Sequence, residues 1–165
     1  MPVHLRLHDP RRGRGRHVNL GGAGPSTSAW SEGQELPERR FGPVTATDIV
    51  RYQGASGDMN PMHHDDAMAR QAGYPEAFSV GMLHAGYLAT YCTSLFGPTS
   101  VRRFRTRFKE LVWRGDVLVA GGAVTSVGPG GQAGVTRVEV DLWMRTGDGR
   151  TAIEGSAAFD LEEQP

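Results

Sequence analysis

The pattern of hydrophobic and polar positions changes its period about two thirds of the way along the chain. Between residues 81 and 96, apolar side chains recur around most of a helical surface: Met82, Leu83, Ala85, Leu88, Tyr91, Cys92 and Leu95. This spacing predicts one long helix that is buried on most sides. Ser79 is the expected N-cap, and Gly97-Pro98 is expected to end the helix.

After residue 101 the period becomes two. Apolar or β-branched residues alternate with arginines along 101–113: Phe104, Thr106 and Phe108 against Arg103, Arg105 and Arg107. The alternation predicts a strand with one solvated face. Further strands are expected over 117–127, 138–144 and 151–160, separated by glycine-rich turns. The pair Gly121-Gly122 indicates a bulge or a close contact within the second of these strands.

Shorter elements precede the long helix. An extended segment is expected over 38–44, followed by a short helix that begins at a capping box formed by Thr45 and Asp48 and ends near Gly54. A second short helix is expected over 64–71. One buried helix followed by consecutive strands predicts a single α+β domain over 31–165, in which an antiparallel sheet wraps around the helix.

The first thirty residues have a different composition. They hold the basic run Arg-Arg-Gly-Arg-Gly-Arg at 11–16 and no hydrophobic period, so residues 1–30 are expected to be a disordered tail. Arginine–glycine arms also bind nucleic acid. The formal net charge of zero argues against a nucleic-acid partner or an anionic membrane.

The remaining composition points to a cytoplasmic protein. Cys92 is the single cysteine, so an intrachain disulfide cannot form. No apolar run is long enough for a transmembrane helix, and the N-terminal region lacks the apolar stretch of a secretory signal.

The strongest chemical signal is the segment 56–63, Ser-Gly-Asp-Met-Asn-Pro-Met-His. Pro61 prevents a continuous helix, so a rigid turn is expected that directs Asp58 and His63 toward one point. An acid and a base around one small volume can move protons on a substrate. Ser56, Gly57, Asn60 and Pro61 are expected to support this turn. Asp58 is also compatible with a purely structural role as a turn cap.

Other side chains have weaker functional interpretations. His63, His64, Asp65 and Asp66 could form a metal cluster, but neighbouring residues on a helix point about 100° apart, and no metal site is expected. His84 and Cys92 are interpreted as core residues. The arginines of the first long strand suit either phosphate binding or a solvated face.

Two motifs together resemble the MaoC-like dehydratase and (R)-specific enoyl-CoA hydratase family, which has the hot-dog fold. They are the segment 56–63 and Gly81-Met82-Leu83, and the resemblance extends over residues 31–161. Arg107-Phe108 and Gly115-Asp116 are similar to later family motifs. The resemblance implies that Asp58 and His63 hold and activate a water, while the backbone N–H of Gly81 polarises the thioester carbonyl. Val80 stands where many members carry His, a difference that bears on substrate preference.

The implied function is a hydro-lyase without cofactor or metal. It would reversibly add water to a 2-enoyl thioester of CoA or acyl carrier protein and yield the (R)-3-hydroxyacyl thioester. The resemblance also implies a homodimer or higher homo-oligomer, with a heterodimer possible. Two alternatives stay open: a hot-dog acyl-thioesterase, and one subunit of a heteromeric 3-hydroxyacyl-thioester dehydratase. Acyl chain length and the choice between CoA and carrier protein stay open as well.

Overall fold

A computed structural model describes residues 30–162 of the chain. The predicted disordered tail lies outside the described residues except for Trp30. Four helical segments and five strands follow one another: β1 (Arg39–Phe41), α1 (Ala46–Ser56), η2 (Pro61–His63), α2 (Asp66–Gln71), α3 (Gly81–Phe96), β2 (Val101–Phe108), β3 (Leu118–Pro129), β4 (Val135–Thr146) and β5 (Thr151–Glu162). Every described helix is too short or too polar to cross a bilayer.

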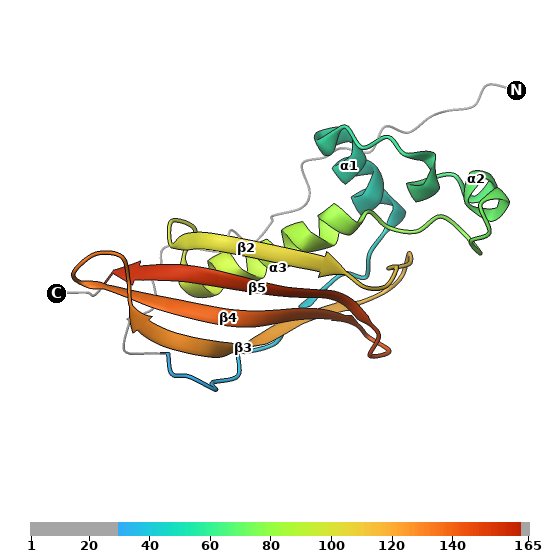
Figure 1. Cartoon of the computed structure of the whole chain (residues 1–165). Helices are drawn as coiled ribbons and strands as arrows, with labels where there is room; N and C mark the ends of the chain where they lie inside the picture. The colour runs from blue at the N-terminus through green and yellow to red at the C-terminus, as the bar shows by residue number, and fades with distance from the viewer. Residues whose placement is uncertain (1–29, 163–165) are drawn as a thin grey trace, which may run out of the picture.

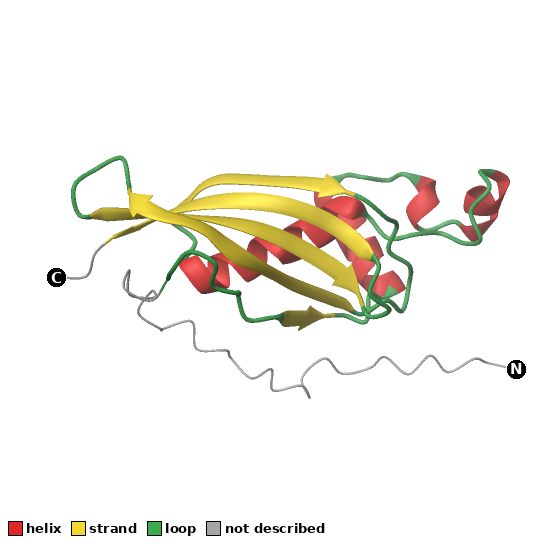
Figure 2. Ribbon diagram, turned by 60° about the horizontal axis from the view of Figure 1, so that its bottom comes forward, coloured by secondary structure: helices red, strands yellow, loops and turns green. Residues whose placement is uncertain are grey.

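The five strands form one antiparallel sheet that curves around α3. The strand order is β1-β3-β4-β5-β2, and α3 lies against one face of the sheet, whereas α1 and α2 lie beyond one end (Figures 1 and 2). Helix and sheet share a core in which the Phe96 and Phe159 rings stack at 4.2 Å and the Tyr91 hydroxyl donates to the carbonyl of Pro37. This α+β arrangement is the hot-dog fold that the sequence predicted.

The long helix has the predicted bounds, but its predicted N-cap is wrong. Val80 occupies the N-cap position, and no side chain caps the helix. The Ser79 hydroxyl instead lies 2.8 Å from the Nε2 atom of His84, one turn into the helix. Both side chains are buried, so the serine satisfies a core histidine and leaves the first N–H groups of α3 available.

The first long strand is shorter than predicted, since it ends at Phe108 and not at residue 113, and its partner is not its neighbour in sequence. Consecutive pairing would place β2 beside β3, but β2 pairs with β5, and its other edge has no strand among the described residues. Residues 109–117 therefore connect two strands that are not neighbours. The apolar side of β2 is incompletely covered, since Phe108 at its end is 48% exposed.

The bounds of the two short helices differ from the predicted ones. The capping box is present: the Asp48 N–H donates to Thr45 Oγ1 at 3.1 Å, and the Thr45 N–H donates to Asp48 Oδ2 at 2.9 Å. Helix α1 continues past the predicted end at Gly54 to Ser56. The second helix starts later than predicted because Pro61 begins a separate 3-10 turn, and Asp65 then caps α2.

The Gly-Gly pair in β3 marks a close contact, as predicted. A β-carbon on Gly121 would overlap the Trp143 ring, and one on Gly122 would overlap the carbonyl oxygen of Asp141. The irregularity in strand register lies slightly further along, between Val124 and Ser126. Glycine thus allows β3 and β4 to approach closely at the centre of the sheet.

Replacing Gly122 by alanine should destabilise the fold. The new β-carbon would meet a backbone oxygen that cannot rotate away, so we expect the free energy of unfolding in urea to fall by about 1–3 kcal/mol. Gly128→Ala in the same strand is the matched control, because its β-carbon would have open space around it, with no atom beyond the adjoining residues within 4 Å. Equal stability of the two variants would contradict this account of the close contact.

Candidate active site

The turn between α1 and α2 is held by a series of local hydrogen bonds. Gly57 ends α1 in the left-handed region, with φ of 77°. The Ser56 hydroxyl accepts from the Asp58 N–H at 3.3 Å, and Asp58 Oδ1 accepts from the Asn60 N–H at 3.3 Å. Asn60 Oδ1 in turn accepts from a backbone N–H of the 3-10 turn, where Pro61 occupies the first position. These short-range bonds, with Pro61 at the start of the 3-10 turn, hold the backbone of the segment 56–63.

The same turn brings the predicted acid and base together. Asp58 Oδ2 lies 3.8 Å from His63 Nε2, and the two side chains are 41% and 11% exposed. This separation is too long for a direct hydrogen bond, but it is short enough for one water at about 2.8 Å from each atom to bridge them. Asp58 thus caps the turn with one oxygen and faces His63 with the other, so the structural and the chemical interpretations are compatible.

A backbone carbonyl sets the orientation of the His63 ring. His63 Nδ1 lies 3.0 Å from the carbonyl oxygen of Phe78. A carbonyl only accepts, so Nδ1 carries the hydrogen. In the neutral ring, Nε2 then has a free lone pair directed toward Asp58. The Phe78 ring also packs edge-on against the imidazole, with centroids 5.2 Å apart.

The segment that supplies this carbonyl is fixed on both sides. The Phe78 N–H donates to the Met62 carbonyl at 3.3 Å, and the Ser79 N–H donates to the Val112 carbonyl at 2.8 Å. The residues just before α3 therefore join the motif turn to the 109–117 connection. This joint places the helix start next to His63.

Gly81, the predicted oxyanion donor, is the first residue of α3. The first N–H groups of a helix have no partner within the helix and lie at the positive end of its dipole. The Phe108 ring packs closely here, since a β-carbon on Gly81 would lie 3.1 Å from it. The glycine therefore allows an aromatic wall to lie directly against the helix start.

His63 and Gly81 line one cavity of about 200 Å³. His84, Phe108, Glu110 and Ala152 contribute to the remaining walls. Asp58 stands beside His63 outside this lining. The structure thus brings the three predicted residues to one place, with His63 between the carboxylate and the helix start.

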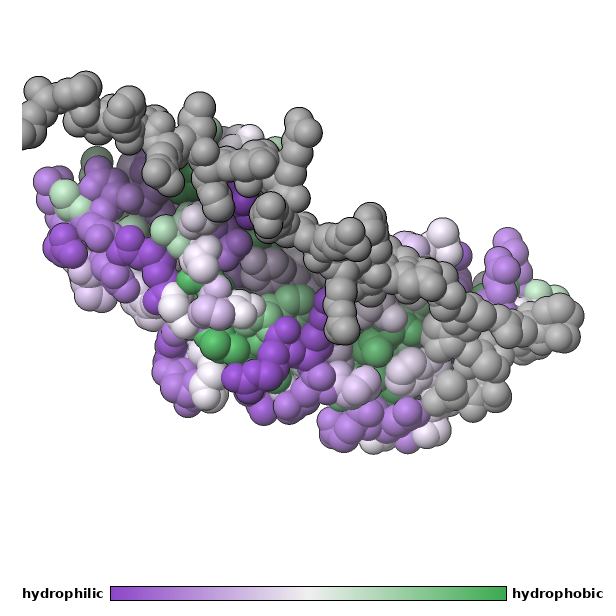
Figure 3. Space-filling model, turned by 180° about the vertical axis from the view of Figure 1, so that it is seen from behind, coloured by the Kyte–Doolittle hydropathy of each residue, from purple (hydrophilic) through white to green (hydrophobic). Residues whose placement is uncertain are grey.

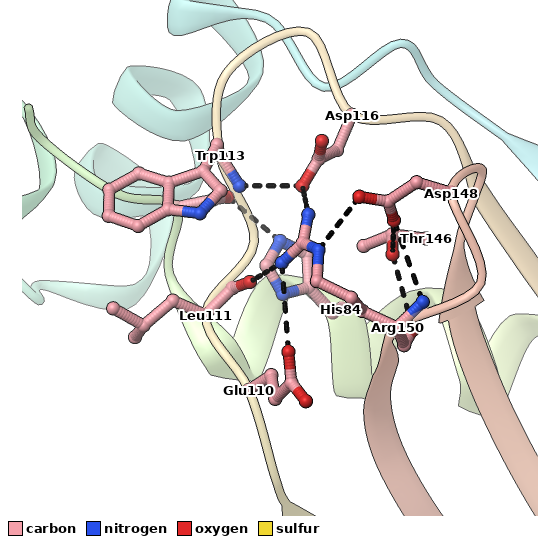
Figure 4. A network of polar contacts seen from close by, with 9 residues as sticks. His84, Glu110, Leu111, Trp113, Asp116, Thr146, Asp148 and Arg150 are labelled. Atoms are coloured by element: carbon pink, nitrogen blue, oxygen red, sulfur yellow. Dashed lines mark hydrogen bonds and ion pairs between the residues drawn. The ribbon is translucent and has the colours of Figure 1, made fainter.

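Arg150, just before β5 and absent from the sequence-based candidates, anchors the wall formed by residues 110–112. Its guanidinium donates to the Leu111 carbonyl at 3.0 Å, to Asp116 Oδ2 at 3.2 Å and to Asp148 Oδ2 at 2.9 Å (Figure 4). Hydrogen bonds from Thr146 and from this arginine lower the pKa of Asp148 to about 2. Since Arg150 is 39 residues from Leu111 in sequence, no local pattern could have indicated this role.

The four residues of the supposed metal cluster have separate partners. His64 Nδ1 lies 3.0 Å from Gln53 Oε1, Asp65 caps α2, and Asp66 Oδ1 accepts from Arg114 at 2.6 Å. Among residues 30–162, no group of three or more His, Cys, Asp or Glu side chains is arranged to hold a metal ion.

His84 is a buried neutral histidine beside the cavity. Its side chain is bonded to Ser79 and the residue is only 2% exposed. Burial is the main reason that its pKa falls to about 4, while the charge of Asp116 acts in the opposite direction. His84 can therefore take part in hydrogen bonds near the site at neutral pH without carrying a charge.

The chain matches the family model described as "MaoC like domain" over residues 28–144. Three solved structures illustrate the likeness. The unliganded R-hydratase PhaJ1 from Pseudomonas aeruginosa is 25% identical, with a TM-score of 0.71 over 84% of this chain and 86% of its own. The (R)-hydratase from A. caviae involved in PHA biosynthesis is 21% identical, with a TM-score of 0.67 over 81% and 98%.

The third is the ChsH1-ChsH2 complex from Mycobacterium tuberculosis. The matched chain of that complex is 22% identical to this chain, with a TM-score of 0.68 over 80% of this chain and 98% of the matched chain. No curated protein sequence matches the chain.

The buried His84 should make stability depend on pH. Its pKa of about 4 in the folded protein lies below the ordinary value of 6.5, so the unfolded chain binds the proton more tightly. Stability should therefore fall as the pH falls from about 6.5 to 4, by up to about 3 kcal/mol from this residue.

Urea unfolding at several pH values checks this dependence against a His84→Gln variant, which retains the other titrating groups. Between about pH 6.5 and pH 4, the unfolding free energy of the wild type should fall more than that of the variant as the pH is lowered. A constant difference would show that His84 does not titrate as described.

Proposed function

The chain belongs to the MaoC-like domain family, and on that premise we propose that it is a hydro-lyase acting on thioesters. It reversibly adds water across the double bond of a 2-enoyl thioester and yields the (R)-3-hydroxyacyl thioester. The family match and the R-hydratases among the similar structures support a hydratase or dehydratase role. The acyl carrier is CoA or acyl carrier protein.

The observation that carries the proposal is the gap between Asp58 Oδ2 and His63 Nε2 at the edge of a cavity that Gly81 also lines. A water in the gap donates one hydrogen to each acceptor, so its lone pairs are free to attack. Its oxygen bonds to C3, one of its protons passes to Asp58 or His63, and the pair delivers a proton to C2. The electrons of the C2–C3 π bond form the new C2–H bond.

Negative charge develops on the thioester oxygen while C3 is attacked. The N–H of Gly81 and the positive end of the α3 dipole would stabilise that charge. The residues require no metal or redox group for these steps. In the reverse direction the same atoms remove water from a 3-hydroxyacyl thioester.

A thioesterase is less well supported. Thioester hydrolysis would use the same acid–base pair and oxyanion donor with the water at the carbonyl carbon, so the family match is what favours hydration. The named relatives support hydration rather than thiol release.

Mutation of the pair tests the proposal. Asp58→Asn and His63→Gln should each lower the hydration rate of crotonyl-CoA about 100-fold or more, because each removes a proton acceptor from the water. The loss of enoyl absorbance measures the rate, and a dehydrogenase specific for (R)-3-hydroxyacyl-CoA reports the product configuration.

Asp141→Asn on β4 is the control, since this carboxylate is exposed on a strand away from the turn. Wild-type inactivity on a series of enoyl thioesters, or full activity in both turn variants, would refute the proposed reaction.

We further propose that the protein forms a homodimer or larger oligomer. Strand β2 is eight residues long and has no neighbour on its outer edge among residues 30–162, and Phe108 and Met82 are large apolar side chains exposed by 48% and 56%. Hydrophobic surface also lies open between polar residues on the face seen in Figure 3. The ChsH1-ChsH2 structure is a complex of two different chains, so a heteromer is the second candidate.

Light scattering at micromolar concentration should give at least twice the mass of 17.9 kDa. The N–H of Lys109 donates to the carbonyl of Ala152 on β5, so along β2 the N–H of Thr106 faces away from β5. A Thr106→Pro substitution removes that outward donor and should weaken association if this edge is the interface. Dependence of activity on a second, different chain would favour the heteromer, and a stable active monomer would contradict both.

A further inference from the structure

Gln53 is a buried polar residue on a helix face that otherwise packs into the core. It lies on α1 one turn after Ile49, and the two residues are 3% and 0% exposed. A buried amide is costly unless its hydrogen-bonding groups are satisfied. The position of Gln53 in α1, one turn after Ile49, is that of a core residue. A polar side chain at a core position suggests that its hydrogen bonds have a specific role.

Every polar group of this side chain is bonded to the motif turn. Nε2 donates to the carbonyl oxygens of Asp58 at 2.8 Å and Asn60 at 3.1 Å, and Oε1 accepts from His64 Nδ1 at 3.0 Å. Two carbonyl partners can only accept, so the amide has one possible orientation. The amide therefore ties three residues of the segment 58–64 to helix α1.

These bonds restrict the residue that bears the proposed catalytic carboxylate. The Asp58 carbonyl is held by Gln53, and the Asp58 carboxylate is held through Oδ1 by the Asn60 N–H. The remaining oxygen, Oδ2, is the one that lies 3.8 Å from His63. Without the amide, the turn has no side chain to hold its two carbonyls, and the aspartate can drift relative to the imidazole.

We propose that Gln53 is a positioning residue that sets the geometry of the Asp58–His63 pair. Its effect on catalysis rests on the proposed hydration reaction, whereas its effect on the turn does not. Misplacement of a reacting group by about 1 Å costs on the order of 100-fold in rate. The amide acts through the turn and does not touch the cavity, so substrate binding should depend on it much less than the chemical step.

The test uses the full chain with Gln53→Leu, which has a similar volume but no hydrogen bonds, and Gln53→Glu, which has the same shape but no amide donors. Each should lower kcat for crotonyl-CoA about 10- to 100-fold, while KM changes by less than about threefold. In an Asp58→Asn background, Gln53→Leu should lower the remaining rate by less than about threefold, because the position of an inactive side chain no longer matters.

The matched control is Ile49→Ala, which removes a fully buried side chain from the same helix without removing a bond to the turn. It should lower thermal stability at least as much as Gln53→Leu and leave kcat within about threefold of wild type. This control separates positioning from a general loss of stability. Equal losses of kcat in Ile49→Ala and Gln53→Leu would overturn the proposal, as would wild-type kcat in a folded Gln53 variant.

Amide hydrogen exchange provides a measurement that needs no substrate. The N–H groups of Asn60 and Met62 are bonded within the turn, so their exchange should become about tenfold faster in Gln53→Leu. Unchanged exchange would overturn the proposal even if activity fell. A wild-type protein that hydrates no enoyl thioester, but shows the faster exchange in the variant, would refute the proposed function and leave the role of Gln53 in the turn intact.

Discussion

The burial of α3 is the constraint on which the rest of the structure depends. This helix is apolar on most sides, so it is stable only where other elements cover it, and the curved sheet covers one long face. Its uncapped first turn then emerges at the end of the sheet beside Phe108. A helix start with free N–H groups therefore lies at a cavity as a consequence of the packing that stabilises the whole domain.

The parts of the fold that depend on local patterns could be predicted from the sequence. The bounds of α3 follow from its apolar spacing and from Gly97-Pro98, and the start of α1 follows from the capping box of Thr45 and Asp48. Strand order could not be obtained in this way. The alternation along 101–113 predicts a strand, but it contains no information on whether β3 or β5 is its neighbour, because that choice depends on the path that the chain takes after Phe108.

The candidate site also has a part that could be predicted from local sequence and a part that could not. Asp58, His63 and Gly81 belong to short motifs, and the turn around them is built mostly from bonds between residues a few positions apart. Gln53 and Arg150 act over longer distances, and only the folded chain identifies their partners. For Ser79 the local pattern gave a wrong prediction. Its sequence position is typical of a helix cap, but its hydroxyl is bonded to the buried His84 instead.

The carbonyl of Phe78 connects the local motif turn with the contacts made by distant parts of the chain, because it determines which nitrogen of His63 carries the hydrogen. With Nδ1 as the donor, the neutral ring and the Asp58 carboxylate present only acceptors to the gap between them. In the proposed reaction, a water there must give both hydrogens to the protein and keep both lone pairs for the substrate. The opposite tautomer would place an N–H in the gap and occupy one of those lone pairs. A single backbone oxygen, held in place by the connection that joins β2 to β3, thus decides whether the pair can orient a nucleophile.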